Sequence, residues 1–218
     1  LTMGKKSIWR PIGRWLIKRR NEAASRGRCC ALMRHLNGKS IAIVGNASSL
    51  LDTTQGPLID SHDVVIRMNA GFPRKPEAQG KRFDVWCFAH MHGARQAPVG
   101  FTVPHAIWMT PMLRHKLDGS LKCCFYPIRH WRRLHALLGA RPSMGAMVVE
   151  LVSRAKPASV SIFGFDFKRT GSFYTNSRHI GPHDYDAEAR YVLGMAGRPG
   201  WRFVATDPAV EPSTARAI

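Results

Sequence analysis

Acidic residues, cysteines and long hydrophobic runs are all scarce in this sequence. Its 218 residues include 14 Asp and Glu against 33 Lys and Arg, which gives a formal net charge of +19. No apolar stretch approaches the roughly 18 to 20 residues that cross a bilayer, and the first residues are cationic rather than a continuous apolar signal core. The sequence therefore predicts neither a transmembrane nor a visibly secreted protein.

The cysteines give no sign of a disulfide framework or a zinc site. There are five, an odd number, and four of them form the adjacent pairs Cys29-Cys30 and Cys123-Cys124, with no C-x-x-C pair. This usage predicts a reduced, cytoplasmic setting. Hydrophobic residues make up 44% of the chain, with six Trp and ten Phe, which is enough for one core and excludes disorder throughout.

More than half of the net charge lies in a basic N-terminal arm or helix, residues 1–39. Residues 1–40 contain 11 Lys and Arg against a single acid, Glu22. Trp9, Ile12, Trp15 and Leu16 add apolar residues to this arm, the last three at helical spacing. Two interpretations stay open: the arm lies on a membrane surface, or these apolar residues dock on the domain while the charges face water.

From residue 40 onward, short apolar runs alternate with helical segments. Ser143 and Asp184 are N-cap residues that open predicted helices, which extend to about Arg154 and Met195. The pattern predicts one α/β domain, residues 40–218, with a Rossmann-like three-layer architecture and a mostly parallel sheet. Seven runs, several of them apolar on both faces, are the predicted strands: Ile41–Val44, Val64–Met68, Phe83–Phe88, Ala106–Met109, Cys123–Tyr126, Val160–Phe165 and Trp201–Ala205.

Two short segments are candidates to bind an anion at the edge of this sheet. The first strand runs into Gly45-Asn46-Ala47-Ser48-Ser49, where small residues let a nucleotide or phosphate approach the strand end. The second, Pro142-Ser143-Met144-Gly145, places a hydroxyl and backbone N–H groups at a helix start. Neither is a G-x-G-x-x-G or P-loop motif, so an ordinary strand-to-helix turn and a plain N-cap are the alternatives.

A third segment, His183-Asp184-Tyr185-Asp186-Ala187-Glu188, carries a candidate general base. A histidine at a helix start lies near the positive end of the dipole, which disfavours imidazolium and leaves a neutral ring able to accept a proton. Two metal-binding alternatives compete with this role: His179 and His183 as ligands four residues apart, and the D-x-D triplet at Asp184 and Asp186. The sequence has no further ligand cluster nearby, which favours the base.

Taken in order, these segments resemble the sialyltransferases of glycosyltransferase family 29. The resemblance covers residues 41 to about 190, and His183 and Glu188 match the H-x4-E motif of the family. Ser172-Phe173-Tyr174-Thr175 is a poor copy of the third motif, in which His-Tyr-aromatic-acid is usual. The long sialylmotif is similar to residues 41–71, with Val44-Gly45-Asn46, Ile59-Asp60-Ser61-His62-Asp63 and Arg67-Met68-Asn69, and the short one to residues 142–165, ending Phe163-Gly164-Phe165.

The chain also departs from the family pattern. Animal members join the long and short motifs by a disulfide in the Golgi lumen, whereas this chain has Ile41 at one position and Ala155 or Lys156 at the other. The joint loss fits a compact, cytoplasmic, bacterial-type member. Met144 replaces the usual Ser or Thr, and the poor third motif leaves the family's phosphate-stabilising histidine unassigned, with His179 as a candidate.

The resemblance implies an inverting, metal-independent glycosyltransferase with a GT-A-like variant of the fold and no cofactor. It would transfer a sugar from a CMP-activated donor to an acceptor hydroxyl, with His183 as the base that takes the acceptor proton. Glu188, five positions after His183, does not share its helical face and is assigned a structural role. The residues predicted to hold the CMP donor are Asn46, Ser48, Ser49, Asn69, Ser143, Gly145 and Tyr174.

The donor sugar and the acceptor stay open. Sialic acid and Kdo are both 2-keto sugar acids activated as CMP esters. The basic arm would suit a glycolipid acceptor at the anionic inner face of the cell membrane, as in lipopolysaccharide or capsule biosynthesis, with the protein cytoplasmic and peripheral. A nucleic-acid-binding protein is the alternative from another class, but the sequence has no helix-turn-helix, zinc-finger or RNP-type motif, so no nucleic acid is expected as a partner.

Overall fold

The computed structural model describes residues 25–91, 95–117, 122–175 and 181–206. Seven strands form one sheet in the order β5-β4-β3-β2-β1-β6-β7, and every pairing between them is parallel. Each strand overlaps one of the seven predicted runs, which confirms the α/β prediction. The strands are β1 (Ser40–Val44), β2 (Val64–Met68), β3 (Val85–Phe88), β4 (His105–Trp108), β5 (Cys124–Phe125), β6 (Ser159–Phe163) and β7 (Trp201–Val204).

The sheet is covered on both faces, as its sequence pattern predicts. Along β1, Ile41 and Ile43 belong to the main core cluster, while Ala42 and Val44 belong to a second cluster on the opposite face. This alternation follows from the period of two in a strand, where successive side chains point to opposite faces. Since all five residues of β2 are also buried, the central strands have no solvent-facing side and the three-layer architecture is confirmed.

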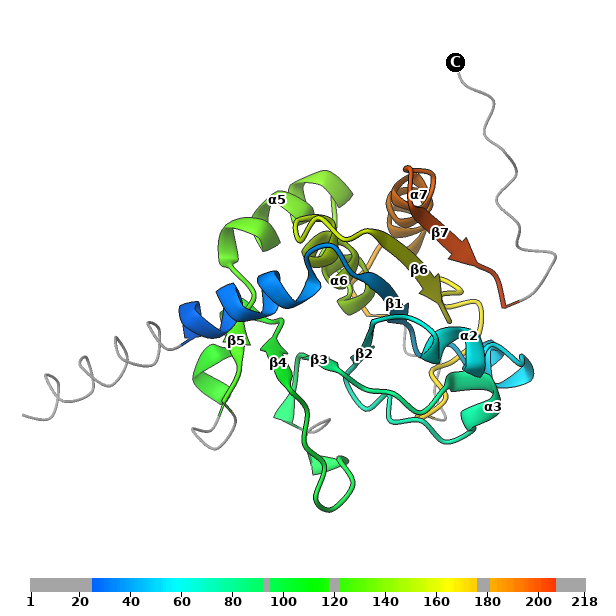
Figure 1. Ribbon diagram of the computed structural model, residues 1–218. Coiled ribbons are helices and arrows are strands. Elements are labelled where there is room, and N and C mark those ends of the chain that lie inside the picture. The colour runs from blue at the N-terminus through cyan, green and yellow to red at the C-terminus, as the bar shows by residue number, and fades with distance from the viewer. Residues whose placement is uncertain (1–24, 92–94, 118–121, 176–180, 207–218) are drawn as a thin grey trace, which may run out of the picture.

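The helices divide between the two faces of the sheet. Figure 1 shows α5 (Ile128–Leu138), α6 (Met144–Ser153) and α7 (Tyr185–Ala196) grouped on one side, with α2 (Gly56–Asp60) and α3 (Pro76–Gln79) together on the other. Two 3₁₀ segments, η1 (Ser48–Asp52) and η2 (Pro111–Lys116), complete the described elements. Both predicted helices are present and capped as expected, because Ser143 Oγ accepts from Ala146 N and Asp184 Oδ1 accepts from Ala187 N.

The described end of the basic arm packs against the domain. Residues 25–36 are helical, and Leu32 and Leu36 are buried in the main core cluster beside Leu134 of α5. The apolar residues of the arm between Trp9 and Leu16 lie outside the described residues. From residue 25 onward, the segment predicted as an arm is therefore a helix that packs in the core. The predicted boundary at residue 39 falls after that helix.

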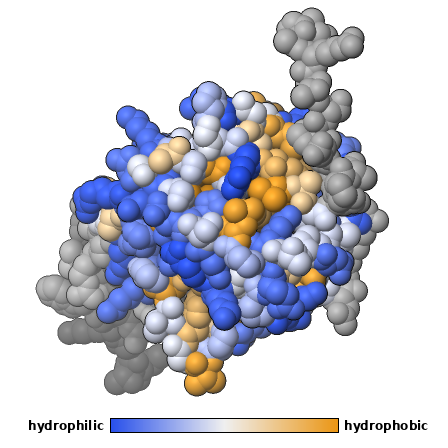
Figure 2. All heavy atoms as spheres, turned by 45° about the vertical axis from the view of Figure 1, so that its right-hand side comes forward, coloured by the Kyte–Doolittle hydropathy of each residue, from blue (hydrophilic) through white to orange (hydrophobic). Residues whose placement is uncertain are grey.

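One face of the molecule is mostly hydrophilic. Figure 2 brings the right-hand side of Figure 1 forward and shows hydrophilic residues over most of that face, with hydrophobic residues in its centre and at its lower edge. Within the described ranges, no helix combines the length and the apolar character that a bilayer crossing requires.

Candidate active site

A cavity lies at the point where the strand order reverses. β1 has β2 on one side and β6 on the other. At the carboxyl ends of these three parallel strands, segments 45–47, 68–69 and 164–168 line a cavity of about 450 Å³, together with the start of α6 and the segment leading into α7. Ligands of open α/β sheets bind at such a switch point, and the volume is typical of a small-molecule site.

Six of the eight predicted site residues line this cavity, and two do not. Ser48 and Ser49 lie outside the lining: Ser48 Oγ donates to the carbonyl oxygen of Gly171 at 2.9 Å, and the hydroxyls of Ser49 and Thr206 share a hydrogen bond of 2.8 Å. Their hydroxyls therefore tie η1 to neighbouring segments, and a role in donor binding remains a prediction for both. The six that line the cavity are Asn46, Asn69, Ser143, Gly145, Tyr174 and His183.

The two asparagines are held by hydrogen bonds before any ligand arrives. Asn46 Nδ2 donates to the Met68 carbonyl at 3.1 Å and lies 3.5 Å from the hydroxyl of Tyr174. Asn69 Oδ1 accepts from the backbone N–H of Ala89 at 3.1 Å, and Asn69 itself has a left-handed backbone, with φ of 50°. A strained backbone at a preorganised side chain is typical of functional sites, so both amides are suited to hold a polar ligand group.

Gly71 explains why Asn46 fits in this position. A Cβ at Gly71 would lie 2.4 Å from Asn46 Oδ1, which is closer than any real contact. The missing side chain therefore makes room for the asparagine. Gly145 has a different role, since a Cβ there would meet the ring of Phe165 at 2.7 Å, and its small size lets α6 pack against the segment that follows β6.

His183 is oriented as a general base requires. Its Nδ1 lies 2.7 Å from the carbonyl oxygen of Arg141. A carbonyl can only accept, so Nδ1 carries the proton and, in the neutral ring, Nε2 is the basic nitrogen. The ring of Tyr185 lies 5.7 Å away, centroid to centroid. Burial, with the charge of Glu188, raises the pKa of Tyr185 to about 12, which keeps that phenol protonated at neutral pH.

Glu188 joins α7 to the start of α6. Its side chain is buried, and its two carboxylate oxygens accept from Ser143, one from the backbone N–H at 2.6 Å and the other from the hydroxyl. Burial raises the pKa of Glu188, and the hydrogen bonds from Ser143 oppose that shift. These contacts agree with the structural role that the sequence assigns to Glu188. They also mean that Ser143 would have to give up Glu188 before it could donate to a phosphate.

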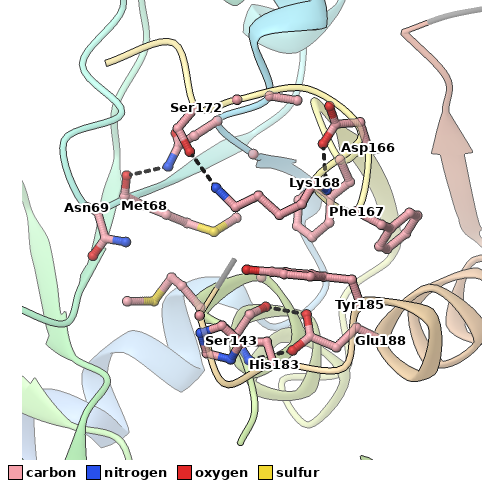
Figure 3. A pocket seen from close by; sticks show the side chains of 18 of the residues that line it. Met68, Asn69, Ser143, Asp166, Phe167, Lys168, Ser172, His183, Tyr185 and Glu188 are labelled. Atoms are coloured by element: carbon pink, nitrogen blue, oxygen red, sulfur yellow. Dashed lines mark hydrogen bonds between the residues drawn. The ribbon is translucent and has the colours of Figure 1, made fainter. Parts of the chain in front are cut away.

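The sequence interpretation missed a loop of the site, residues 166–168, and two neighbouring side chains, Arg141 and Tyr185. Figure 3 shows Lys168 and Ser172 on one wall of the pocket and Ser143, His183, Tyr185 and Glu188 on the opposite wall. A signal for the loop was available, because it directly follows β6 and therefore lies at the same sheet edge as Gly45.

The two aspartates of the D-x-D triplet, Asp184 and Asp186, do not line the cavity. Asp184 caps α7, and Asp186 is exposed in its first turn. Among the residues that the structure describes, no group of three or more His, Cys, Asp and Glu could hold a metal ion. His179, the other candidate ligand, lies outside those residues. The geometry therefore gives the D-x-D alternative no support, the alternative that involves His179 is untested, and metal-independent turnover stays a prediction.

Comparison with known sequences identifies relatives of this chain. Residues 28–79 match the model of glycosyltransferase family 29 (sialyltransferase). The chain is 26% identical to sialyltransferase-like protein 2 of Oryza sativa subsp. indica, over 86% of this chain and 62% of that protein. It is 34% identical to a β-1,6-galactosyltransferase of Arabidopsis thaliana over a shorter part, 38% of this chain and 23% of the relative. The chain thus spans less than two thirds of the length of either plant relative.

Solved structures share the fold at low sequence identity. A mammalian sialyltransferase superposes with a TM-score of 0.55 and 20% identity, over 77% of this chain and 69% of that structure. An α-2,3-sialyltransferase from Campylobacter jejuni superposes with a TM-score of 0.53 and 15% identity, over 79% and 78%. The matched family model, the plant relative and the shared fold agree: the chain is similar to the sialyltransferases of glycosyltransferase family 29.

Proposed function

We propose that the protein is an inverting glycosyltransferase that moves a 2-keto sugar acid from a CMP-activated donor to a hydroxyl of a glycan or glycolipid acceptor. The observation that carries this proposal is the hydrogen bond between His183 Nδ1 and the Arg141 carbonyl. It orients the imidazole at the edge of the pocket so that, in the neutral ring, Nε2 is the basic atom. Similarity to the family and a nucleotide-sized cavity at the sheet switch point support the same reaction class.

The proposed reaction is a single displacement. The acceptor oxygen attacks the anomeric carbon while Nε2 of His183 takes its proton, and the bond from that carbon to the phosphate oxygen breaks. The bonding electron pair leaves with CMP, so the phosphate gains negative charge. Asn46 and Asn69, fixed by Met68 and Ala89, would hold the nucleotide and so keep the reacting carbon in place.

Of all parts of the proposal, the relatives restrict the identity of the donor sugar least. Sialic acid is our first choice because the rice relative is sialyltransferase-like and the two structural neighbours are sialyltransferases. Kdo is the alternative with the same CMP activation and the same 2-keto acid chemistry. A galactose donor also has to be tested, since the Arabidopsis relative is a galactosyltransferase.

A donor screen tests the proposed reaction. We expect nucleotide release from CMP-sialic acid or CMP-Kdo and none from UDP-galactose, other UDP-sugars or GDP-sugars, measured by chromatography of the released nucleotide. We also expect the rate to be the same in EDTA, because neither aspartate of the D-x-D triplet lines the cavity. Release from UDP-galactose alone would contradict the CMP donor. Loss of turnover in EDTA, restored by Mg²⁺ or Mn²⁺, would contradict the metal-independent site.

We further propose that the basic arm holds the protein peripherally on an anionic membrane, at the cytoplasmic face. Residues 1–24 contain seven Lys and Arg and one acid, together with Trp9, Ile12, Trp15 and Leu16. Cationic charge next to apolar residues is the composition of a segment that binds a lipid surface. The residues that line the cavity all lie between Gly45 and Glu188, so membrane binding and transfer should be separable.

Deletion of residues 1–24 tests this separation, because it stops short of the helical residues 25–36 that pack in the core. We expect transfer to a small soluble acceptor to stay within about twofold, and co-sedimentation with phosphatidylserine-containing vesicles to fall. Binding by the full chain should weaken as salt rises, since charges are screened beyond about 8 Å at 0.15 M ionic strength.

Vesicles of phosphatidylcholine alone are the control, and neither form should bind them strongly. If the deletion instead abolishes the cooperative thermal transition, the arm packs on the domain and its proposed membrane role is wrong.

A further inference from the structure

Lys168 places a cation on the wall of the pocket opposite His183. Its side chain extends along that wall, and Nζ donates to the hydroxyl of Ser172 at 3.0 Å (Figure 3). The residue is partly buried. Burial lowers the pKa of Lys168, and the charge of Asp166 opposes that shift. A partly desolvated ammonium group gains more from an anionic ligand than one in open solvent, because the local dielectric is lower.

The backbone that carries Lys168 is held in an unusual conformation. Phe167 and Lys168 both have left-handed backbones, with φ of 53° and 66°, a conformation that is unfavourable for non-glycine residues and is found mainly where the surrounding structure holds it in place. The carboxylate of Asp166 supports this turn: it accepts from the N–H of Lys168 at 3.0 Å and of Thr170 at 2.7 Å, and from the Thr170 hydroxyl. The ring of Phe167 stacks on Phe203, with centroids 6.0 Å apart. These contacts hold the turn in place, and with it the Lys168 side chain on the pocket wall.

On the opposite wall, Ser143 has no donor left to offer an anion. The backbone N–H and the hydroxyl of Ser143, at the start of α6, both donate to Glu188. Arg141, the other basic chain in the lining besides histidines, is exposed to solvent. Both carboxylates of the lining, Asp166 and Glu188, are occupied by groups of the protein. A phosphate in this pocket therefore finds its strongest charge partner at Lys168.

We propose that Lys168 binds the phosphate of the CMP donor and stabilises the charge that this phosphate gains as CMP leaves. This rests on the proposed function of the site. Lys168 stays protonated throughout: the electron pair of the broken bond moves to the phosphate oxygen, and the ammonium group neutralises it without giving up a proton. The acceptor proton still goes to His183. Lys168 thus supplies the positive charge beside the phosphate. The weak third motif offers no histidine for that role.

A comparison of CMP with cytidine isolates this interaction, because the two ligands differ only in the phosphate. Calorimetry should show that the wild-type chain prefers CMP over cytidine. In Lys168→Met, we expect that preference to fall by roughly 10- to 100-fold, the range for loss of a charged hydrogen bond, with cytidine binding within threefold of wild type. Turnover of the CMP-sugar should fall by roughly 10²-fold, as for removal of one donor to a developing anion. Lys168→Arg should retain part of both.

Lys156→Met is the matched control. Lys156 also has a left-handed backbone, with φ of 52°, and is exposed outside the cavity lining, so the variant removes the same charge at the same kind of backbone position. It should keep the CMP preference. Lys168→Gln gives a second neutral variant if Lys168→Met lowers the thermal transition.

The outcomes separate the inference from the proposed function. A wild-type preference for CMP that Lys168→Met and Lys168→Gln leave unchanged overturns the role of Lys168 and leaves the CMP site intact. Equal binding of CMP and cytidine by the wild-type chain overturns both.

Discussion

Replacing His183 by alanine should lower the rate of sugar transfer by about 10²- to 10⁴-fold, the usual contribution of a general base. CMP binding should stay within a few fold of wild type, because the base acts on the acceptor hydroxyl rather than on the nucleotide. Single-turnover transfer assays and calorimetry with CMP measure the two quantities on the same preparation. A loss of CMP binding with transfer close to normal would make His183 a donor ligand and not the base.

His183→Asn separates the base from its structural contact. The asparagine amide retains an N–H that can donate to the Arg141 carbonyl, but it has no nitrogen that accepts a proton at neutral pH. We therefore expect His183→Asn to be as inactive as His183→Ala while its thermal transition stays close to wild type. His135→Ala is the control for loss of an imidazole, because His135 is exposed on α5 and stacks on Trp131 outside the cavity. It should retain full transfer.

Gly45→Ala should lower the free energy of unfolding by about 3 kcal/mol, the upper part of the range for overpacking a close contact. A Cβ at Gly45 would lie 2.2 Å from the carbonyl oxygen of Gly164 and 2.7 Å from Cδ2 of Phe165. The nearest group is backbone, so the ends of β1 and β6 must separate. That would weaken the bond from Gly45 N to the Phe163 carbonyl, 2.7 Å long.

The thermal midpoint measures this change. For a chain of this size, about 3 kcal/mol corresponds to a midpoint roughly 6–12 °C lower. Gly194→Ala is the matched control, because a Cβ at Gly194 in α7 meets nothing within 4 Å. It should raise stability by roughly 0.5–1 kcal/mol, since alanine is a better helix former than glycine. Equal midpoints for the two variants would mean that the β1 and β6 ends yield easily, and the close packing at the switch point would lose its structural importance.

The fold was predictable because its signals are local. The seven strands follow from apolar runs of four to six residues, and α6 and α7 follow from Ser143 and Asp184, whose side chains cap the helices in the structure. Helix α5 was not predicted, and the helical residues 25–36 were predicted only as part of an arm or helix over residues 1–39. α5 begins after Pro127 with no side-chain cap, so the usual mark of a helix start is missing from its sequence.

The candidate site was predictable where a motif stands next to the end of an element. Asn46 follows β1, Asn69 follows β2 and His183 precedes α7, and each of them lines the cavity. Position along the chain does not say which way a hydroxyl points. Ser48 and Ser49 follow the same strand as Asn46, yet they bond to Gly171 and Thr206, more than 120 residues away in sequence.

By itself, the sequence determined the strands of the sheet, two capped helices and the resemblance to one family, because periodicity, capping and motif order are properties of neighbouring residues. Only the tertiary structure decided which donors of the pocket are bonded to other protein groups and where its charged side chains lie. Ser143 and Glu188 are 45 residues apart, and their pairing takes both donors of Ser143, the N-cap of α6, away from the cavity. Lys168 reaches the cavity through a left-handed turn supported by Asp166. The turn at Lys168 is local, but its position across the cavity from α6 and α7, like the pairing of Ser143 with Glu188, comes from the packing of separate elements at one sheet edge. No pattern within a single segment encodes that packing.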